Sequence, residues 1–304
     1  AAAAWLQRLD AAQHAHALGI VLSLAAGNME FLSDGAWTKR LHPGWAAVCG
    51  ITAAAFAASG YIGPAAPLEG RYGLYNTLLG AGGWELGALG EDLGRDWRTL
   101  GVAFKPYPAC HFNHAFADCA LHLRREHALE AAEIASVTAL IHPHQVAIVC
   151  EPLAAKQRPQ NAYEAQFSVP WIVAAALARG RFTLAEIEPD ALVDPALTTL
   201  AARVDYADDP HSSYPQYYSA GLLVRTHDGR ELYHHIAVNR GTDANPMTES
   251  EILDKYRDNA TRWVSAGQAE RIADGVLSLD AAPNLGELAH ALSAAAPPDQ
   301  RRAC

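Results

Sequence analysis

Two short segments of the chain bring cationic and aromatic side chains together near rigid turns. In the first, Lys39 and His42 stand before a Pro-Gly pair, which predicts a deeply buried helix that runs to about Ser59. Backbone amides at the start of a helix carry partial positive charge, so a lysine and a histidine there favour the binding of carboxylates. When this segment is taken alone, an exposed surface lysine is the commoner explanation.

The second segment places reactive side chains around two prolines: Lys105, Tyr107, Cys110 and His111. A reaction that moves a proton next to a carboxylate must stabilise negative charge on the neighbouring carbon. Lys39 and Lys105 can bind carboxylates as point charges, and burial beside another cation lowers a lysine pKa toward the range that suits acid or base catalysis. Tyr107 can donate a hydrogen bond, although a tyrosine between two prolines is at least as often a packing residue.

Together these segments resemble the MmgE/PrpD family. The resemblance rests on Thr-Lys-Arg-Leu-His-Pro-Gly at residues 38–44 and on Phe-Lys-Pro-Tyr-Pro-Ala-Cys at residues 104–110, in that order and at that separation. Residues 165–171 resemble a later helix start of the family, and residues 246–252 resemble its closing helical segment. The resemblance therefore covers nearly the whole chain.

Family members include 2-methylcitrate dehydratase, cis-aconitate decarboxylase and iminodisuccinate epimerase. The resemblance thus implies a homodimeric, cofactor-free lyase or isomerase that acts on a small polycarboxylate. It also implies two sets of site residues. The residues that would act on the substrate are Lys39, Lys105 and His111, and those that would bind it are His42, Tyr107, Cys110 and Trp171.

Two positions depart from the cis-aconitate decarboxylases that the chain resembles. Cys110 stands where they carry a histidine, so the role of that histidine has either moved to His111 or been lost. Trp171 stands where they carry a tyrosine, and an indole has no phenolic proton to exchange. Both differences point toward a dehydratase, an epimerase or an uncharacterised branch of the family, and we favour a dehydratase of the 2-methylcitrate type. The alternatives are an epimerase of an iminodisuccinate-like substrate and a catalytically silent scaffold.

Composition restricts the class of partner. The chain has 304 residues, half of them hydrophobic, which is enough for one large core or two modest ones. Its formal net charge of -10 argues against binding to a phosphate backbone, so no nucleic-acid partner is expected. A protein of this charge needs local cations to bind an anionic substrate, which directs attention to Lys39 and Lys105.

The sequence gives no pattern for a metal or another cofactor. The five cysteines lack metal-ligand spacing, neighbouring histidines such as His234 and His235 would face opposite sides of a strand, and the glycine clusters match no nucleotide loop. No signal peptide and no apolar run of about 20 residues is apparent, so we expect a cytoplasmic protein without a membrane partner. Since the chain starts in a helical pattern without methionine or a capping residue, we expect it to lack an N-terminal part.

The fold class predicted is α+β, with a mainly α-helical body and an inserted smaller α+β lid domain. Shifts in composition and pattern place the first part of the helical domain at residues 1–101, the lid at 102–245, and helices that complete the helical domain at 246–304. Lys39 and Lys105 then belong to different lobes. We predict that they approach one cleft, with His111 nearby, so that closure of the lid completes the site.

Hydrophobic periodicity and turn residues also predict individual elements. Asp10 and Gln13 form a capping box for a helix, and His227-Asp228-Gly229 marks a hairpin turn. The predicted strands are Ile134–Ile141, Gln145–Val149, Arg203–Ala207, Tyr218–Arg225 and Arg230–Val238. The predicted later helices are Cys110–Arg125, Tyr163–Arg179, Asp190–Ala202, one that Thr248 or Ser250 caps, Gln268–Leu279 and Leu285–Ala294, with the ordered chain ending at Pro297-Pro298. Because of Pro170, the helix within Tyr163–Arg179 either starts at Ser168 or kinks at the proline.

Overall fold

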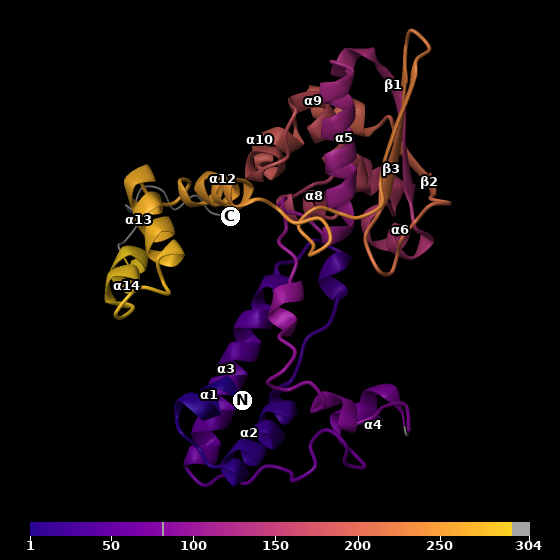
Figure 1. Ribbon diagram of the computed structural model, residues 1–304. Coiled ribbons are helices and arrows are strands. Elements are labelled where there is room, and N and C mark those ends of the chain that lie inside the picture. The colour runs from indigo at the N-terminus through magenta and orange to yellow at the C-terminus, as the bar shows by residue number, and fades with distance from the viewer. Residues whose placement is uncertain (81, 294–304) are drawn as a thin grey trace. The chain divides into compact units, whose positions relative to one another are not determined.

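The computed structural model describes residues 1–80 and 82–293 (Figure 1). The chain forms two compact units, Ala1–Leu100 and Gly101–Cys304. Helices dominate, and one small mixed sheet lies in the second unit. The α+β class is therefore confirmed. The inserted lid and the three-part domain division stay predictions.

The first unit is a small helical cluster built on close contact between two helices. Its helices are α1 (Ala2–Leu6), α2 (Ala11–Leu24), α3 (Thr38–Ala58) and α4 (Leu74–Leu79). The predicted capping box begins α2, where the Gln13 N–H donates to the Asp10 carboxylate at 2.8 Å and the Asp10 N–H donates to Gln13 at 3.0 Å. Small buried residues, among them Ala53 and Ala57, let α3 pack against α2.

Helix α3 differs from the prediction in its start and in its burial. It begins at Thr38, so Lys39 and His42 lie in its first turns and Pro43 lies inside it. A proline near a helix start removes only one intrahelical hydrogen bond, here to the Lys39 carbonyl, and α3 continues through it. The expected deep burial is wrong for most of α3, because Leu41 and Ile51 are each 60% exposed.

Helix α3 also corrects the expectation about apolar length. Within residues 1–80 and 82–293 it is the one helix long and apolar enough to cross a membrane by length and composition. Its most apolar 18-residue window has a mean hydropathy of 1.3, and 22% of that window is buried. The expectation that no apolar run reaches about 20 residues is therefore wrong for α3. A protein's core helix passes the same test, so the absence of a membrane partner stays a prediction.

The second unit contains a four-stranded sheet in the order β2-β1-β3-β4. Strand β1 (Ile134–Ile141) pairs in parallel with β2 (Val204–Asp208) and antiparallel with β3 (Ala220–Thr226), which pairs antiparallel with β4 (Glu231–Ile236). The Asp-Gly turn joins β3 to β4 as predicted, and Gly229 supplies the positive φ of 90° that this tight turn needs. These four strands confirm four of the five predicted ones.

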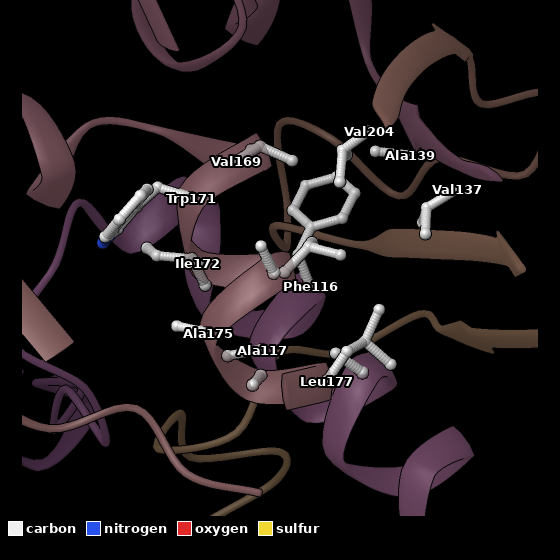
Figure 2. Close-up of a cluster of buried hydrophobic side chains, with 14 of the residues drawn as sticks. Phe116, Ala117, Val137, Ala139, Val169, Trp171, Ile172, Ala175, Leu177 and Val204 are labelled. Atoms are coloured by element: carbon white, nitrogen blue, oxygen red, sulfur yellow. The ribbon is translucent and has the colours of Figure 1, made fainter. Parts of the chain in front are cut away.

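Two helices build most of the core of the second unit against this sheet. Helix α5 (His114–Glu126) packs on β3 and β4, and α9 (Val169–Arg179) packs on α5 and α11 (Pro195–Ala201). Figure 2 shows Phe116 of α5 and Ile172 of α9 in this cluster. The remaining helices between β1 and β2 are α6 (Pro143–Val149), α7 (Leu153–Gln157), α8 (Ala162–Gln166) and α10 (Pro189–Leu192).

Two predicted elements of this unit are corrected, and the choice left open at Pro170 is decided in favour of a helix start at Ser168. The expected strand Gln145–Val149 is part of α6, because His142 caps it and Pro143 occupies its first position. A short apolar run alone does not separate a strand from a buried helix. The helix expected over Tyr163–Arg179 divides at Ser168, whose hydroxyl accepts the Trp171 N–H at 3.0 Å and caps α9. The helix expected over Asp190–Ala202 is divided at Pro195 into α10 and α11.

In the part of the chain described after the sheet, up to residue 293, there are three helices. They are α12 (Glu249–Ala260), α13 (Ala266–Leu277) and α14 (Gly286–Ser293). Thr248 caps α12 in a capping box with Glu251, which chooses between the two predicted caps. The predicted end of the chain at Pro297-Pro298 lies outside the described residues.

Candidate active site

A close backbone contact in the second unit holds the Lys105 segment against the segment that follows the sheet. The Phe104 N–H donates to the Gly241 carbonyl at 2.8 Å. Gly241 has a φ of 93°, and a Cβ there would lie 1.9 Å from the Phe104 carbonyl oxygen. Only glycine fits such an approach. Lys105, Tyr107 and His111 are thereby held beside Asn239 and Arg240.

Two lysines meet at one end of this arrangement. Lys105 Nζ donates to the Ala109 carbonyl at 3.1 Å, and Lys255 of α12 donates to the Lys105 carbonyl. Burial, together with the charge of Lys105, lowers the pKa of Lys255. A shallow pocket of about 220 Å³ opens here, and its lining residues are Phe104, Lys105, Met247, Ile252, Lys255, Tyr256 and Asn259.

Tyr107, two positions after Lys105, is a buried member of a charged network. Its hydroxyl donates to Asp118 Oδ1 at 2.5 Å and accepts from Arg240 Nη2 at 2.9 Å. Arg240 also donates to Asp118 at 3.0 Å and to Glu251 at 2.5 Å. Burial and then the Asp118 carboxylate raise the pKa of Tyr107 far above its ordinary value. Tyr107 therefore stays protonated, and its hydroxyl links α5 to Arg240.

His111 sits beside this network in a ring of aromatic and amide groups. Asn239 Nδ2 lies 2.9 Å from His111 Nε2. The Tyr218 ring lies 5.1 Å from the His111 ring in a T-shaped arrangement, and His114 lies 5.0 Å away. Burial and the charge of Lys105 lower the pKa of His111, so its imidazole is neutral at pH 7. Burial, and then His111, lower the pKa of His114 to about 3.

The structure places Cys110 next to His111 but gives it a packing role. The Cys110 N–H donates to the Gln166 carbonyl at 2.8 Å, and the half-buried side chain packs against the main core. This contact joins the start of the α5 segment to α8. Cys110 is thus near the site, while the neighbouring imidazole is the group suited to proton chemistry.

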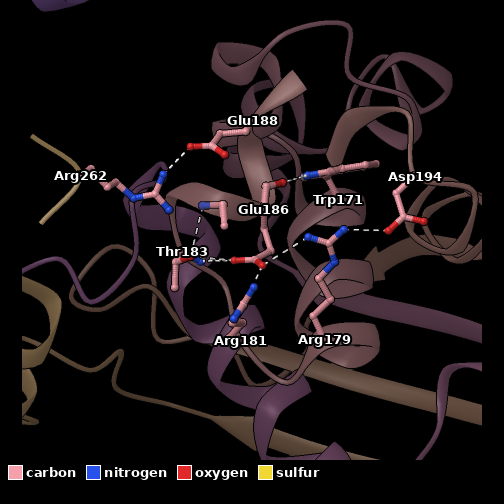
Figure 3. Close-up of polar contacts among 9 residues, drawn as sticks. Trp171, Arg179, Arg181, Thr183, Glu186, Glu188, Asp194 and Arg262 are labelled. Atoms are coloured by element: carbon pink, nitrogen blue, oxygen red, sulfur yellow. Dashed lines mark hydrogen bonds and ion pairs between the residues drawn. The ribbon is translucent and has the colours of Figure 1, made fainter. Parts of the chain in front are cut away.

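Trp171 lies in the core and not in this arrangement. It is 0% exposed, and its indole N–H donates to the Glu186 carbonyl at 2.9 Å (Figure 3). The Glu186 carboxylate is itself buried and accepts from Arg181 Nε at 2.9 Å and from the Thr183 N–H at 2.8 Å. In this structure Trp171 has no surface open to a ligand. Its expected role in substrate binding stays a prediction without structural support.

Lys39 and His42 belong to the first unit, where both approach Phe31. Lys39 Nζ is 5.8 Å from the centre of the Phe31 ring, and the His42 ring meets the same ring edge-on at 5.9 Å. Lys39 is exposed at the start of α3. Its shared cleft with Lys105 stays a prediction.

Several residues of the arrangement were missed from the sequence. Lys255 and Asn239 lie 150 and 128 positions from their partners Lys105 and His111, and no local motif marks them. His114 carried a usable signal, since it follows His111 by three positions at the start of a helix.

Comparison with known families agrees with this reading of the segments. The MmgE/PrpD C-terminal domain matches residues 107–281, and the MmgE/PrpD N-terminal domain matches residues 1–87. The chain belongs to the MmgE/PrpD family, and the resemblance inferred from residues 38–44 and 104–110 is confirmed.

The similar curated proteins are named cis-aconitate decarboxylase or cis-aconitate decarboxylase-like. A cis-aconitate decarboxylase-like protein of Aspergillus oryzae is 26% identical over 90% of this chain and 58% of its own length. The cis-aconitate decarboxylase of Aspergillus terreus strain NIH 2624 is 27% identical over 87% of this chain and 56% of its own length. The human cis-aconitate decarboxylase is 26% identical over 98% of this chain and 61% of its own length. The chain thus spans somewhat more than half the length of these relatives.

Proposed function

We propose that this protein is a cofactor-free lyase that acts on a small polycarboxylate. The observation that carries the proposal is the meeting of Lys105 and Lys255 beside a neutral His111. In a chain of net charge -10, two lysines that line one pocket are a local receptor for carboxylates. Family membership and the relatives named cis-aconitate decarboxylase support the same class of reaction.

The reaction we favour is elimination of water of the 2-methylcitrate dehydratase type. Such a reaction removes a proton from a carbon next to a carboxylate, and hydroxide leaves the adjacent carbon as water after it takes up a proton. Lys105 would bind the carboxylate and oppose the charge that develops on it. Lys255, whose pKa is lowered, would remove the carbon-bound proton as a neutral amine, and the ammonium group so formed would give a proton to the leaving hydroxide. His111 would donate a hydrogen bond to the carboxylate oxygen.

Decarboxylation is the second candidate, and the names of the relatives favour it. Cys110 and Trp171 favour the dehydratase, because neither supplies the histidine or tyrosine found in the decarboxylases that the chain resembles. An epimerase of an iminodisuccinate-like substrate would also use two lysines and a proton transfer. A silent scaffold would keep the fold without turnover. Among residues 1–80 and 82–293 no cluster fits a metal ion, and a cofactor-free reaction stays part of the proposal.

Product analysis separates these candidates. The chain is incubated with 2-methylcitrate, citrate, cis-aconitate or iminodisuccinate, and proton NMR follows the products. A new alkene signal from 2-methylcitrate supports the dehydratase, and release of carbon dioxide from cis-aconitate supports the decarboxylase. Loss of optical activity without a new compound indicates an epimerase. No change with any substrate would support the scaffold.

A homodimer in the cytoplasm completes the proposal. Exposed apolar side chains such as Trp45 and Ile51 on α3 support self-association, since large exposed apolar patches often mark contact surfaces. Sedimentation at micromolar concentration should give twice the 32.5 kDa chain mass. A monomer at that concentration would overturn this part alone.

A further inference from the structure

The side chain of Asn239 is buried and has a defined orientation. It is 1% exposed, and its Oδ1 accepts the Tyr218 N–H at 3.0 Å. A backbone N–H can only donate, so this atom of the amide is the oxygen. The other end of the amide is then the NH₂ group, which lies 2.9 Å from His111 Nε2. The Thr242 hydroxyl, which donates to the Asn239 carbonyl at 3.1 Å, holds the same segment.

An amide NH₂ donates hydrogen bonds and does not accept them, so His111 Nε2 must accept this one with its lone pair. The proton of the neutral ring then resides on Nδ1. We propose that Asn239 is a positioning residue that locks His111 in the neutral Nδ1–H tautomer, so that His111 acts as a hydrogen-bond donor and not as a base. Neither the family match nor the sequence pattern assigns Asn239 a role.

The groups that face His111 favour this state. A second proton on His111 Nε2 would make that atom a donor that faces the Asn239 N–H, which is also a donor. The hydrogen bond between Asn239 and His111 would then be lost. The titratable groups with an electrostatic effect on His111 or on the neighbouring His114 ring are Lys105, Lys255 and the two histidines themselves, and none of them supplies negative charge. Tyr218 contributes an aromatic ring, which meets the imidazole in a T-shaped contact at 5.1 Å. Within residues 1–80 and 82–293, no carboxylate hydrogen-bonds to His111 to stabilise an imidazolium.

The consequence for catalysis rests on the proposed function. A base at His111 would need a free lone pair, and Asn239 occupies the one at Nε2. The Nδ1–H can instead donate to a substrate carboxylate oxygen as negative charge develops there, without a change in the charge of the ring. Removal of the carbon-bound proton is then left to a lysine. Asn239 itself does not touch the substrate in this assignment.

The tautomer can be measured directly in the unmodified chain. Long-range ¹H–¹⁵N NMR spectra of the chain labelled with ¹⁵N-histidine distinguish a protonated ring nitrogen from one with a lone pair. His111→Gln identifies the His111 signals among the 14 histidines. We expect protonated Nδ1 and unprotonated Nε2 at pH 7. An Nε2–H tautomer or a charged ring in the unmodified chain would overturn the proposal, whatever a variant does.

Asn239→Asp tests the cause. The aspartate keeps an oxygen for the Tyr218 N–H but replaces the NH₂ group by an acceptor of negative charge. His111 should change to the Nε2–H tautomer, and its pKa should rise by about 1 to 3 pH units. Asn245→Asp is the matched control, because Asn245 donates to the Val238 carbonyl at 2.9 Å in the same segment. Equal His111 signals in Asn239→Asp and in the unmodified chain would refute the proposal that Asn239 fixes the tautomer of His111.

Kinetics then test the positioning role separately from the proposed reaction. On a turned-over polycarboxylate, Asn239→Asp should lower kcat more than it changes KM and should introduce a new ionisation in the pH profile of kcat. Unchanged kcat and pH profile would overturn the positioning role. If the unmodified chain turns over no polycarboxylate, the proposed function fails while the NMR result still decides the tautomer.

Discussion

At the scale of single residues, the site depends on charge that is concentrated in a chain of opposite overall sign. Lys105 and Lys255 share one backbone contact and one pocket, while the cation of Arg240 is held by Asp118 and Glu251. The two lysines are therefore the cations that can serve a substrate, and Arg240 serves the structure.

Replacing either lysine by methionine tests this division. Lys105→Met and Lys255→Met keep most of the packing of the stem and delete the charge. Each should cost about 1.5 to 3 kcal/mol of transition-state stabilisation, which is roughly a ten- to hundredfold loss in kcat/KM. The measurement is steady-state kinetics on the polycarboxylate that is turned over.

A matched variant on the same helix controls for the loss of a positive charge. Arg257 of α12 pairs with Glu270 at 2.7 Å and does not line the pocket. Arg257→Met should leave kcat/KM within about twofold, since exposed ion pairs contribute little. Equal losses in all three variants would indicate a general effect of charge and contradict the specific role of Lys105 and Lys255.

At the scale of elements, the contact at Gly241 joins the Lys105 segment to the end of the sheet. Gly241→Ala should destabilise the second unit for two reasons. The new Cβ would clash with the Phe104 carbonyl, and alanine would be held at a positive φ that disfavours a side chain. Gly229→Ala is the matched control, since Gly229 has a φ of 90° with nothing within 4 Å of the added Cβ. Urea unfolding should show that the free energy of unfolding of Gly229→Ala is about 1 to 2 kcal/mol lower than that of the unmodified chain.

The difference between these two glycine variants isolates the clash. The free energy of unfolding of Gly241→Ala should fall by about 1 to 3 kcal/mol more than that of Gly229→Ala, because overpacking usually costs this much. Equal losses would mean that backbone conformation alone matters, and the contact would not position Lys105.

The elements also show which parts of the fold a single sequence predicts. Capping boxes and the Asp-Gly turn are local, so the starts of α2 and α12 and the β3–β4 hairpin were predicted correctly. The strand expected at Gln145–Val149 failed because its apolar run is as suitable for a buried helix. The start of α3 was missed because Pro43 is tolerated inside the first turns.

The candidate site was predictable only where its residues are close in sequence. Lys105, Tyr107 and His111 share one segment, and the chemistry of their side chains marked it. Asn239, Arg240 and Lys255 meet that segment only after the sheet and α12 have formed, so no spacing could indicate them.

At the scale of the whole molecule, buried histidines couple stability to pH. The pKa of His114 falls from 6.5 to about 3 in the folded chain, chiefly because of burial. The unfolded chain therefore takes up this proton first, and the contribution of His114 to stability is complete above pH 6.5 and falls as the pH drops toward 3. Between pH 6.5 and about pH 3, His114 alone can lower the free energy of unfolding by at most about 1.4 kcal/mol per pH unit.

Urea unfolding between pH 7 and pH 4 measures this effect. The unmodified chain should lose stability more steeply than His114→Gln, because glutamine does not titrate. His111 has a lowered pKa as well and remains in both proteins, so the difference in slope reports His114. Parallel pH dependences of the two proteins would contradict the assignment.

We propose that this chain is a polycarboxylate lyase whose cations include Lys105 and Lys255. Proton NMR of 2-methylcitrate incubated with the unmodified chain and, in parallel, with Lys105→Met tests this proposal. We expect loss of the substrate signal with appearance of an unsaturated tricarboxylate, and a roughly ten- to hundredfold slower reaction in the variant, or about 1.5 to 3 kcal/mol. Unchanged substrate in both samples, or equal rates in both, would contradict it.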